Sequence, residues 1–230
     1  MSNPAFFITG TDTDAGKTTI AGGLLYAAQQ QGLSTLATKP VASGCSLSPE
    51  GLRNADALHL QAYSTVSATY EEINPFAFEP PIAPHIAAAK ANRLLNSARL
   101  LPKVQALLPK GADFPLVEGA GGWHVPLNQT ERLSDLALQL QLPVILVVGI
   151  RLGCINHALL TMDAIQHAGL PLAGWVANQI EPHTEAAQEN IDCLKISMRA
   201  PCLGVIPHQP HLTAADVAQH IDLSPLLSKA

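Results

Sequence analysis

Residues 10–18 read GTDTDAGKT and lie between a short apolar run, Ala5–Thr9, and a segment with helical periodicity. This is the strand, loop and helix order of a phosphate-binding loop, in which backbone N–H groups and a helix N-terminus bind phosphate oxygens. The usual loop has four residues between its first glycine and the Gly-Lys-Thr, whereas this one has five. We expect the wider bend to leave Lys17 within reach of the phosphates and the Thr18 hydroxyl facing Mg²⁺. The alternative is an ordinary strand-to-helix turn with a chance Gly-Lys-Thr.

Other short apolar runs follow Gly or Pro along the chain and alternate with helical patterns. Continuous rather than alternating apolar character predicts strands covered on both faces, as in a parallel sheet. The predicted fold class is therefore α/β, with a single doubly wound, mainly parallel sheet, helices on both faces and one domain over residues 1–230. The expected strands are 5–9, 34–39, 113–118, 143–149, 171–177 and 201–206, with helices at 18–32 and 156–168.

Composition narrows the class of protein. The 230 residues are 47% hydrophobic and 13% charged, which allows a large buried core. A formal charge of −5, with scattered lysines and arginines, argues against a nucleic-acid partner. Four cysteines without C-x-x-C spacing predict reduced thiols and no zinc site. The longest apolar run, 142–150, is far shorter than the ~20 residues of a membrane span. No basic targeting region opens the chain, so we expect a cytoplasmic protein that does not bind membranes.

Two further strand ends carry charged residues. Glu118 ends a predicted strand before the glycine-rich 119–122, and Lys39-Pro-Val-Ala-Ser-Gly44 follows another. Because the carboxyl ends of parallel strands meet at one edge of a sheet, Glu118 is expected to face a metal and Lys39 to reach the phosphates. The alternative for Lys39 is a side chain in water. Asp56 opens a predicted helix, and an Asp at such a position is a solvated helix cap more often than a metal ligand.

Two other segments suggest ligand contacts. Leu152-Gly-Cys-Ile-Asn156 is a second strand-to-helix turn, whose N–H groups suit a carboxylate as well as a phosphate. Cys154 lacks a flanking His-Asp arrangement or a basic neighbour, so we expect the backbone to act there and not the thiol. The long stretch 43–84, which ends in the proline-rich 79–84, is the expected ligand-covering excursion.

Five motifs follow one another along the chain: Gly10–Thr18, Lys39–Gly44, Val117–Trp123, Leu152–His157 and Gly174–Asn178. In this order they resemble the dethiobiotin synthetase family over nearly the whole chain. The resemblance implies a P-loop NTPase-like fold and an ATP- and Mg²⁺-dependent cyclo-ligase. Its implied reaction closes the ureido ring from 7,8-diaminononanoate and CO₂ in biotin synthesis, in a homodimer with active sites at the subunit interface.

The same resemblance implies roles for individual residues. Lys17 and Lys39 would hold the phosphates and a substrate carbamate, with Thr13 and Ser43 near the reacting centre. Mg²⁺ would be surrounded by Thr18, Asp56 and Glu118. Further nucleotide contacts are implied for Asp14, Ala15, Gly16, Thr19, Gly119, Ala120, Gly121, Asn178, Gln179, Ile206, Pro207 and His208. The substrate would contact Ser43 and, from the other subunit, the turn residues Gly153, Cys154, Ile155 and Asn156.

Two other functions share this architecture. Partitioning and septum-positioning ATPases carry a signature lysine early in the phosphate loop, where this chain has Asp12, and have no equivalent of the turn at 152–156. A non-catalytic nucleotide sensor would not need both lysines together with Glu118. The sequence therefore favours the cyclo-ligase.

Overall fold

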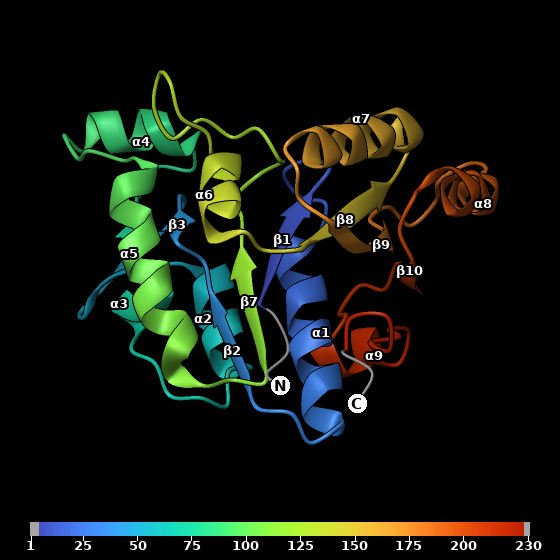
Figure 1. Cartoon of the computed structure of the whole chain (residues 1–230), viewed down its shortest axis with the longest axis horizontal. Helices are drawn as coiled ribbons and strands as arrows, with labels where there is room; N and C mark the ends of the chain where they lie inside the picture. Colours follow the sequence, from blue (N-terminus) through green and yellow to red (C-terminus); the bar gives the residue numbers. More distant parts are fainter. Residues whose placement is uncertain (1–4, 228–230) are drawn as a thin grey trace.

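A computed structural model describes residues 5–227 and is built around one parallel sheet. In the described residues this sheet has six strands in the order β10-β9-β8-β1-β7-β2, and every neighbouring pair is parallel. From β1 the chain adds strands in both directions, so the sheet is doubly wound as predicted (Figure 1). The strands are β1 (Phe6–Gly10), β2 (Thr35–Thr38), β7 (Phe114–Glu118), β8 (Val144–Ile150), β9 (Leu172–Gln179) and β10 (Cys202–Ile206).

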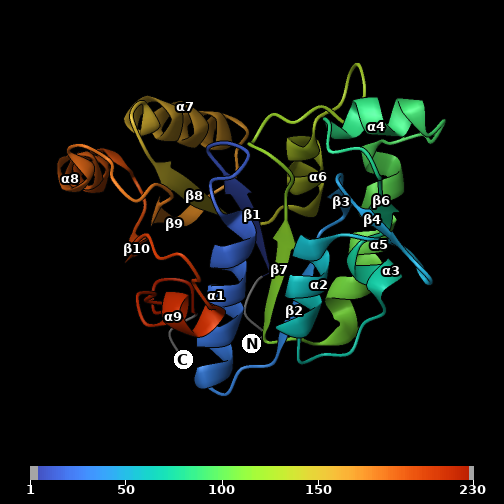
Figure 2. The same cartoon turned by 180° about the vertical axis from the view of Figure 1, so that it is seen from behind.

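Both faces of the sheet are covered by helices, which explains why its strands are continuously apolar. Phe6 and Ile8 of β1 belong to one buried cluster, whereas Phe7 between them belongs to the cluster on the opposite face. The two sets of helices can be followed in Figure 1 and, from behind, in Figure 2. The first face carries α1 (Lys17–Gln30), α2 (Ala55–Ala62) and α9 (Ala214–Ala218), and the second α5 (Ser97–Leu107), α6 (Leu133–Leu140), α7 (Cys154–His167) and α8 (Ala187–Ser197).

Element bounds differ from the sequence prediction where tertiary contacts extend or shorten them. The strand expected to end at residue 177 continues to Gln179, because Asn178 pairs with Gly149 of β8 and Ile206 of β10. The helix expected from residue 156 begins at Cys154, directly after Gly153 with φ = 92°. These extensions bring Asn178 and the first turn of α7 to the carboxyl edge of the sheet.

The excursion 43–84 is folded and not an irregular loop. It contains a hairpin, two helices and a short strand that pairs parallel with the chain just after Lys39. Its proline-rich end returns to the carboxyl edge of the sheet and leads into another helix. The remaining elements of the molecule are β3 (Val41–Ala42), β4 (Ser46–Ser48), β5 (Gly51–Arg53), α3 (Tyr70–Ile73), β6 (Phe76–Ala77), α4 (Pro84–Lys90) and the 3₁₀ helix η1 (Leu108–Lys110).

Three sequence expectations concern the chain as a whole. All four cysteines are free thiols. Between residues 5 and 227, every helix is too short or too polar to cross a lipid bilayer. The single predicted domain also includes residues 1–4 and 228–230, which lie outside the described residues.

Candidate active site

The loop between β1 and α1 has the geometry of an anion site. Gly16 precedes α1 with φ = 89°, and no side chain in the described residues caps the first turn of this helix. The first N–H groups of α1 therefore carry partial positive charge without a side-chain partner. A Cβ at Gly16 would lie 2.2 Å from Nδ2 of Asn178. That amide donates to the carbonyl oxygen of Ala15 at 2.9 Å and braces the loop from the end of β9.

The loop is also closed by contacts around Asp12. The Lys17 ammonium is buried and donates to the Asp12 carbonyl oxygen at 3.1 Å. The Asp12 carboxylate accepts the N–H of Thr13 at 2.8 Å and forms an ion pair with Arg151, the residue after β8. The wider loop is thus tied to the neighbouring strand. Sequence reasoning missed Arg151, although its position at a strand's carboxyl end was a usable signal.

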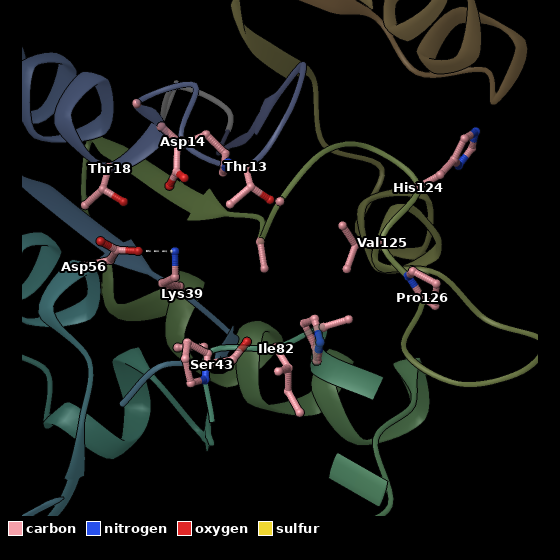
Figure 3. Close-up of a pocket in the computed structure, with 18 of the residues that line it drawn as sticks. Thr13, Asp14, Thr18, Lys39, Ser43, Asp56, Ile82, His124, Val125 and Pro126 are labelled. Carbon is pink, nitrogen blue, oxygen red and sulfur yellow. Dashed lines mark ion pairs between the residues drawn. The ribbon is translucent and has the colours of Figure 1, made fainter. Parts of the chain in front are cut away.

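Lys39 lies between the carboxylates of Asp56 and Glu118, and Figure 3 shows its ion pair with Asp56. Its Nζ is 2.6 Å from Oε1 of Glu118 and 2.8 Å from Oδ2 of Asp56. The Thr18 hydroxyl donates to the same Glu118 oxygen at 2.8 Å. Lys39 and Glu118 are buried, and about half of the Asp56 side chain is exposed, at 45%. The three residues to which the resemblance assigns the metal therefore form one connected group with Lys39.

The two lysines differ electrostatically. Burial opposes the charge of Lys39, but the nearby Glu118 and Asp56 outweigh burial and raise its pKa. For Asp56, burial favours the neutral acid, but the charge and hydrogen bond of Lys39, the hydroxyl of Thr18 and the charge of Lys17 together outweigh burial and lower the pKa. Burial lowers the pKa of Lys17, and the attraction of Glu118 does not compensate. The charge of Lys39 is thus compensated by carboxylates of the protein. The charge of Lys17 is not fully compensated, so a bound anion would stabilise it.

One oxygen of Glu118 supports a metal site. Its Oε2 is buried and has no hydrogen-bond partner in the structure. An unpartnered buried carboxylate oxygen is costly unless a ligand completes it. Residues 5–227 contain no cluster of three His, Cys, Asp or Glu side chains suited to a metal. A hard cation would therefore need Thr18 and ligand oxygens besides Glu118 and Asp56, which is the usual situation for Mg²⁺.

Lys17, Thr18, Lys39 and Asp56 line a cavity of about 900 Å³, whereas Glu118, which contacts Lys39 and Thr18, is not among the lining residues. The phosphate loop and Lys39 line one side, and Ser43 lies between them and the proline-rich segment 81–84 (Figure 3). The excursion therefore borders the cavity as predicted. Three residues that sequence reasoning missed, His124, Val125 and Pro126, line the opposite side. The lining residues are Thr13, Asp14, Gly16, Lys17, Thr18, Thr19, Lys39, Ala42, Ser43, Asp56, Pro81, Ile82, Ala83, Pro84, Ala120, Gly121, His124, Val125 and Pro126.

Other predicted site residues do not line this cavity. Gly119 follows β7, where a Cβ would approach the Phe7 ring at 3.2 Å. At the ends of β9 and β10, Asn178 and Ile206 pair in register and are buried, with Gln179, Pro207 and His208 beside them. The turn Gly153–Asn156 starts α7 and does not line the cavity of its own chain; Cys154 there is buried.

Sequence comparison finds relatives of this chain that share one enzyme name. A family model described as an AAA domain matches residues 4–216. The ATP-dependent dethiobiotin synthetase of Pseudomonas paraeruginosa strain PA7 is 58% identical over 223 residues, which covers 97% of this chain and 98% of that protein. The enzyme of the same name from Cellvibrio japonicus is 57% identical over 227 residues, 99% of both chains.

Structural comparison shows the same architecture in more distant proteins. The cell division protein MinD of Aquifex aeolicus superposes with a TM-score of 0.57, covering 96% of this chain and 88% of MinD. Its sequence identity is 16%, so the likeness concerns the fold alone.

The buried ion pair of Lys39 generates a first prediction. Lys39→Met leaves Glu118 buried without its cationic partner, so we expect the free energy of unfolding to fall by about 3 kcal/mol or more. Urea denaturation followed by circular dichroism measures this change. The matched control is Lys110→Met, because Lys110 pairs with Glu72 at 2.8 Å on the surface. Equal destabilisation by the two substitutions would contradict the role assigned to burial.

Proposed function

Because this chain belongs to the ATP-dependent dethiobiotin synthetases, we propose that it closes the ureido ring of dethiobiotin from 7,8-diaminononanoate, CO₂ and ATP. The observation that carries the proposal is the 58% identity to a named enzyme over 97% of the chain. The site agrees chemically, since a phosphate loop and a second buried lysine share one cavity of about 900 Å³. That volume lies within the range of small-molecule sites.

In this proposal the loop and Lys17 bind the triphosphate. The uncapped start of α1 and the ammonium of Lys17 supply positive charge from two directions. Thr13, Asp14 and Thr19 line the same wall of the cavity. Adenine would lie at the ends of β9 and β10, between Asn178 with Gln179 and the segment 206–208, while Gly119, Ala120 and Gly121 border the phosphates.

We propose that Mg²⁺ is held by Thr18, Asp56 and Glu118 together with phosphate oxygens. The unpartnered Oε2 of Glu118 supports this assignment. When bound, such an ion neutralises part of the charge on the transferring phosphoryl group. The protein's own part is to hold the two carboxylates in place, which it does through Lys39.

The proposed reaction has three steps. An amine of the diamine adds to CO₂ and loses a proton to give a carbamate. A carbamate oxygen attacks the γ-phosphorus of ATP, the bond to the ADP oxygen breaks, and a carbamic-phosphoric anhydride forms. The second amine then attacks the carbonyl carbon and loses a proton, and the carbon–oxygen bond to phosphate breaks, so that the ring closes and phosphate leaves.

Carbamate and triphosphate are both anionic, so their approach is opposed by Coulomb repulsion. Lys39 and Lys17 border the space in which they would meet and can stabilise the transferring charge. Ser43 and Thr13 place hydroxyl groups in the same cavity. These four residues are our proposed catalytic set.

We further propose that the enzyme is a homodimer in which the turn Gly153–Asn156 serves the cavity of the partner subunit. The turn forms the start of a helix of 14 residues that has no side-chain cap, which suits the substrate carboxylate. Next to it, Leu152 is 96% exposed and Leu160 of the same helix is 61% exposed. Apolar side chains beside an unused anion site fit a subunit interface.

A partitioning or septum-positioning ATPase is not favoured. The position of that group's signature lysine is held by Asp12, whose carboxylate is paired with Arg151. The likeness to MinD rests on 16% identity, against 58% for a dethiobiotin synthetase.

The direct test is to incubate the protein with ATP, Mg²⁺, bicarbonate and the diamine and to detect dethiobiotin by mass spectrometry. Lys39→Met is expected to lower kcat on the order of 10²- to 10³-fold, because a preorganised charge is lost. Binding of ATP, measured by calorimetry, should weaken only modestly. Lys110→Met serves as control. Unchanged turnover in Lys39→Met would remove Lys39 from the mechanism.

The metal assignment makes a separate prediction. Glu118→Gln should raise the Mg²⁺ concentration for half-maximal activity by about 10-fold or more, because a charged ligand becomes neutral. Titration of Mg²⁺ at saturating ATP measures this shift, and excess chelator should abolish activity. Glu72→Gln, on the surface, is the control. An unaltered Mg²⁺ requirement in Glu118→Gln would refute the ligand role.

The dimer proposal is tested at α7. Leu160→Glu should shift the sedimentation coefficient to that of a monomer and abolish dethiobiotin formation, because each site then lacks the turn supplied by the other chain. Ile196→Glu, at an 87% exposed position on α8, should leave both properties unchanged. A stable monomer that retains activity would disprove the shared site.

A further inference from the structure

The main chain of Lys39 is held outside the parallel sheet. Lys39 directly follows Thr38, which is the last residue of β2 that pairs with β7. Its N–H donates to the carbonyl oxygen of Ile73 at 2.9 Å, and its carbonyl oxygen accepts from Nδ2 of Asn74 at 2.7 Å. The hydroxyl of Thr38 also donates to Ile73, at 2.7 Å. The place of Lys39 is thus set by the end of α3.

One phenol hydroxyl connects this support to a second segment. Tyr70 is the first residue of α3, is buried, and does not line the cavity. Its hydroxyl donates to Oδ1 of Asn74 at 3.1 Å and accepts the N–H of Asn54 at 2.6 Å. Asn74 is only 3% exposed, so water cannot readily replace a lost donor. Without the hydroxyl, the amide that holds Lys39 loses its own support.

The second segment carries the other half of the ion pair. Asn54 caps α2 by accepting the N–H of Ala57 at 3.2 Å, and its Nδ2 donates to the Ser43 carbonyl oxygen at 3.3 Å. Asp56 lies in the first turn of this helix and pairs with Lys39. The Tyr70 hydroxyl therefore joins the supports of Lys39, Asp56 and Ser43.

Tyr70 is itself well fixed. The guanidinium of Arg53 lies 4.2 Å from its ring centroid and pairs with Glu71 at 3.1 Å. Burial raises the pKa of the Tyr70 phenol, which keeps the hydroxyl protonated and able to donate. Both the ring and the hydroxyl of Tyr70 are therefore held in place by neighbouring residues.

We propose that Tyr70 is a positioning residue, whose hydroxyl sets the distance between the Lys39 ammonium and Asp56 by bridging Asn74 and Asn54. The inference rests on the proposed function insofar as it assigns Lys39 to phosphoryl transfer. The hydroxyl acts at a distance from the substrate, through the backbone of Lys39 and the cap of α2.

The test is Tyr70→Phe in the full chain, assayed for dethiobiotin. We expect kcat to fall by about 10-fold, because small displacements of a catalytic group are costly. The KM for ATP should stay within about 2-fold, because Tyr70, Asn74 and Asn54 form no hydrogen bond with the phosphate loop. In a cycle with Asn74→Ala the two losses should be strongly non-additive, as for members of one network.

A second measurement is independent of catalysis. Brief acetylation with acetic anhydride, followed by peptide mass spectrometry, compares labelling of Lys39 with that of Lys110. Lys39 is 5% exposed, so it should react slowly in the wild type. Tyr70→Phe should raise its labelling relative to Lys110 several-fold.

Two controls separate positioning from stability. Thr69→Ala removes the capping box of α3 and so destabilises the same helix while keeping the hydroxyl. Tyr63→Phe makes the same chemical change at the end of α2, where the ring packs edge-on against Tyr26. Both should keep kcat and Lys39 labelling near the wild-type values.

Unchanged kcat and Lys39 labelling in folded Tyr70→Phe would overturn the inference. It would also be overturned if kcat fell in proportion to the melting temperature in Tyr70→Phe, Thr69→Ala and Tyr63→Phe alike. If the wild type forms no dethiobiotin, the proposed function fails. The labelling result then still decides whether Tyr70 positions Lys39.

Discussion

The site depends on one buried carboxylate. Glu118 lies at the end of a central strand with its side chain fully enclosed, and an isolated charge there would be costly. Its Oε1 receives the Lys39 ammonium at 2.6 Å and the Thr18 hydroxyl at 2.8 Å. Since these donors come from the chain after β2 and from α1, a single anion fixes three segments relative to one another. The cavity keeps its shape because Glu118 must remain paired.

The parallel sheet makes that convergence possible. The carboxyl ends of β2, β7, β1 and β8 follow one another along the sheet, so the residues after them meet at one edge. Lys39 and Glu118 are 79 positions apart, and Asp12 and Arg151 are 139 apart, yet each pair is in contact. The strand order therefore determines which charges are neighbours, and the loops only adjust their distances.

The same distinction explains what could be predicted from sequence. The six strands of the parallel sheet follow local patterns and lie within two residues of their predicted bounds. The loop 10–18 and Glu118 lie at the carboxyl ends of their strands, as predicted. Asp56 was ambiguous, because a helix-opening Asp caps a helix more often than it binds a ligand; its contact with Lys39 resolves its place. The contacts of Tyr70 with Asn54 and Asn74 follow from no local pattern, and for Arg151 the only signal was its place at a strand's carboxyl end. The nucleotide, substrate and metal roles themselves stay predictions, since they concern contacts outside the chain.

The ion pair at Lys39 also bears on how a cation could be accommodated. Lys39 occupies Oε1 of Glu118 and Oδ2 of Asp56, whereas Oε2 of Glu118 has no partner. The two faces of one carboxylate can thus serve a resident lysine and a further cation without exchange of the lysine. Breaking a buried pair costs several kcal/mol, so a site that preserves its pair avoids this loss on ligand binding. Lys17 has no such carboxylate partner within the loop and relies on a backbone carbonyl oxygen, which makes it the lysine whose charge an incoming anion stabilises most.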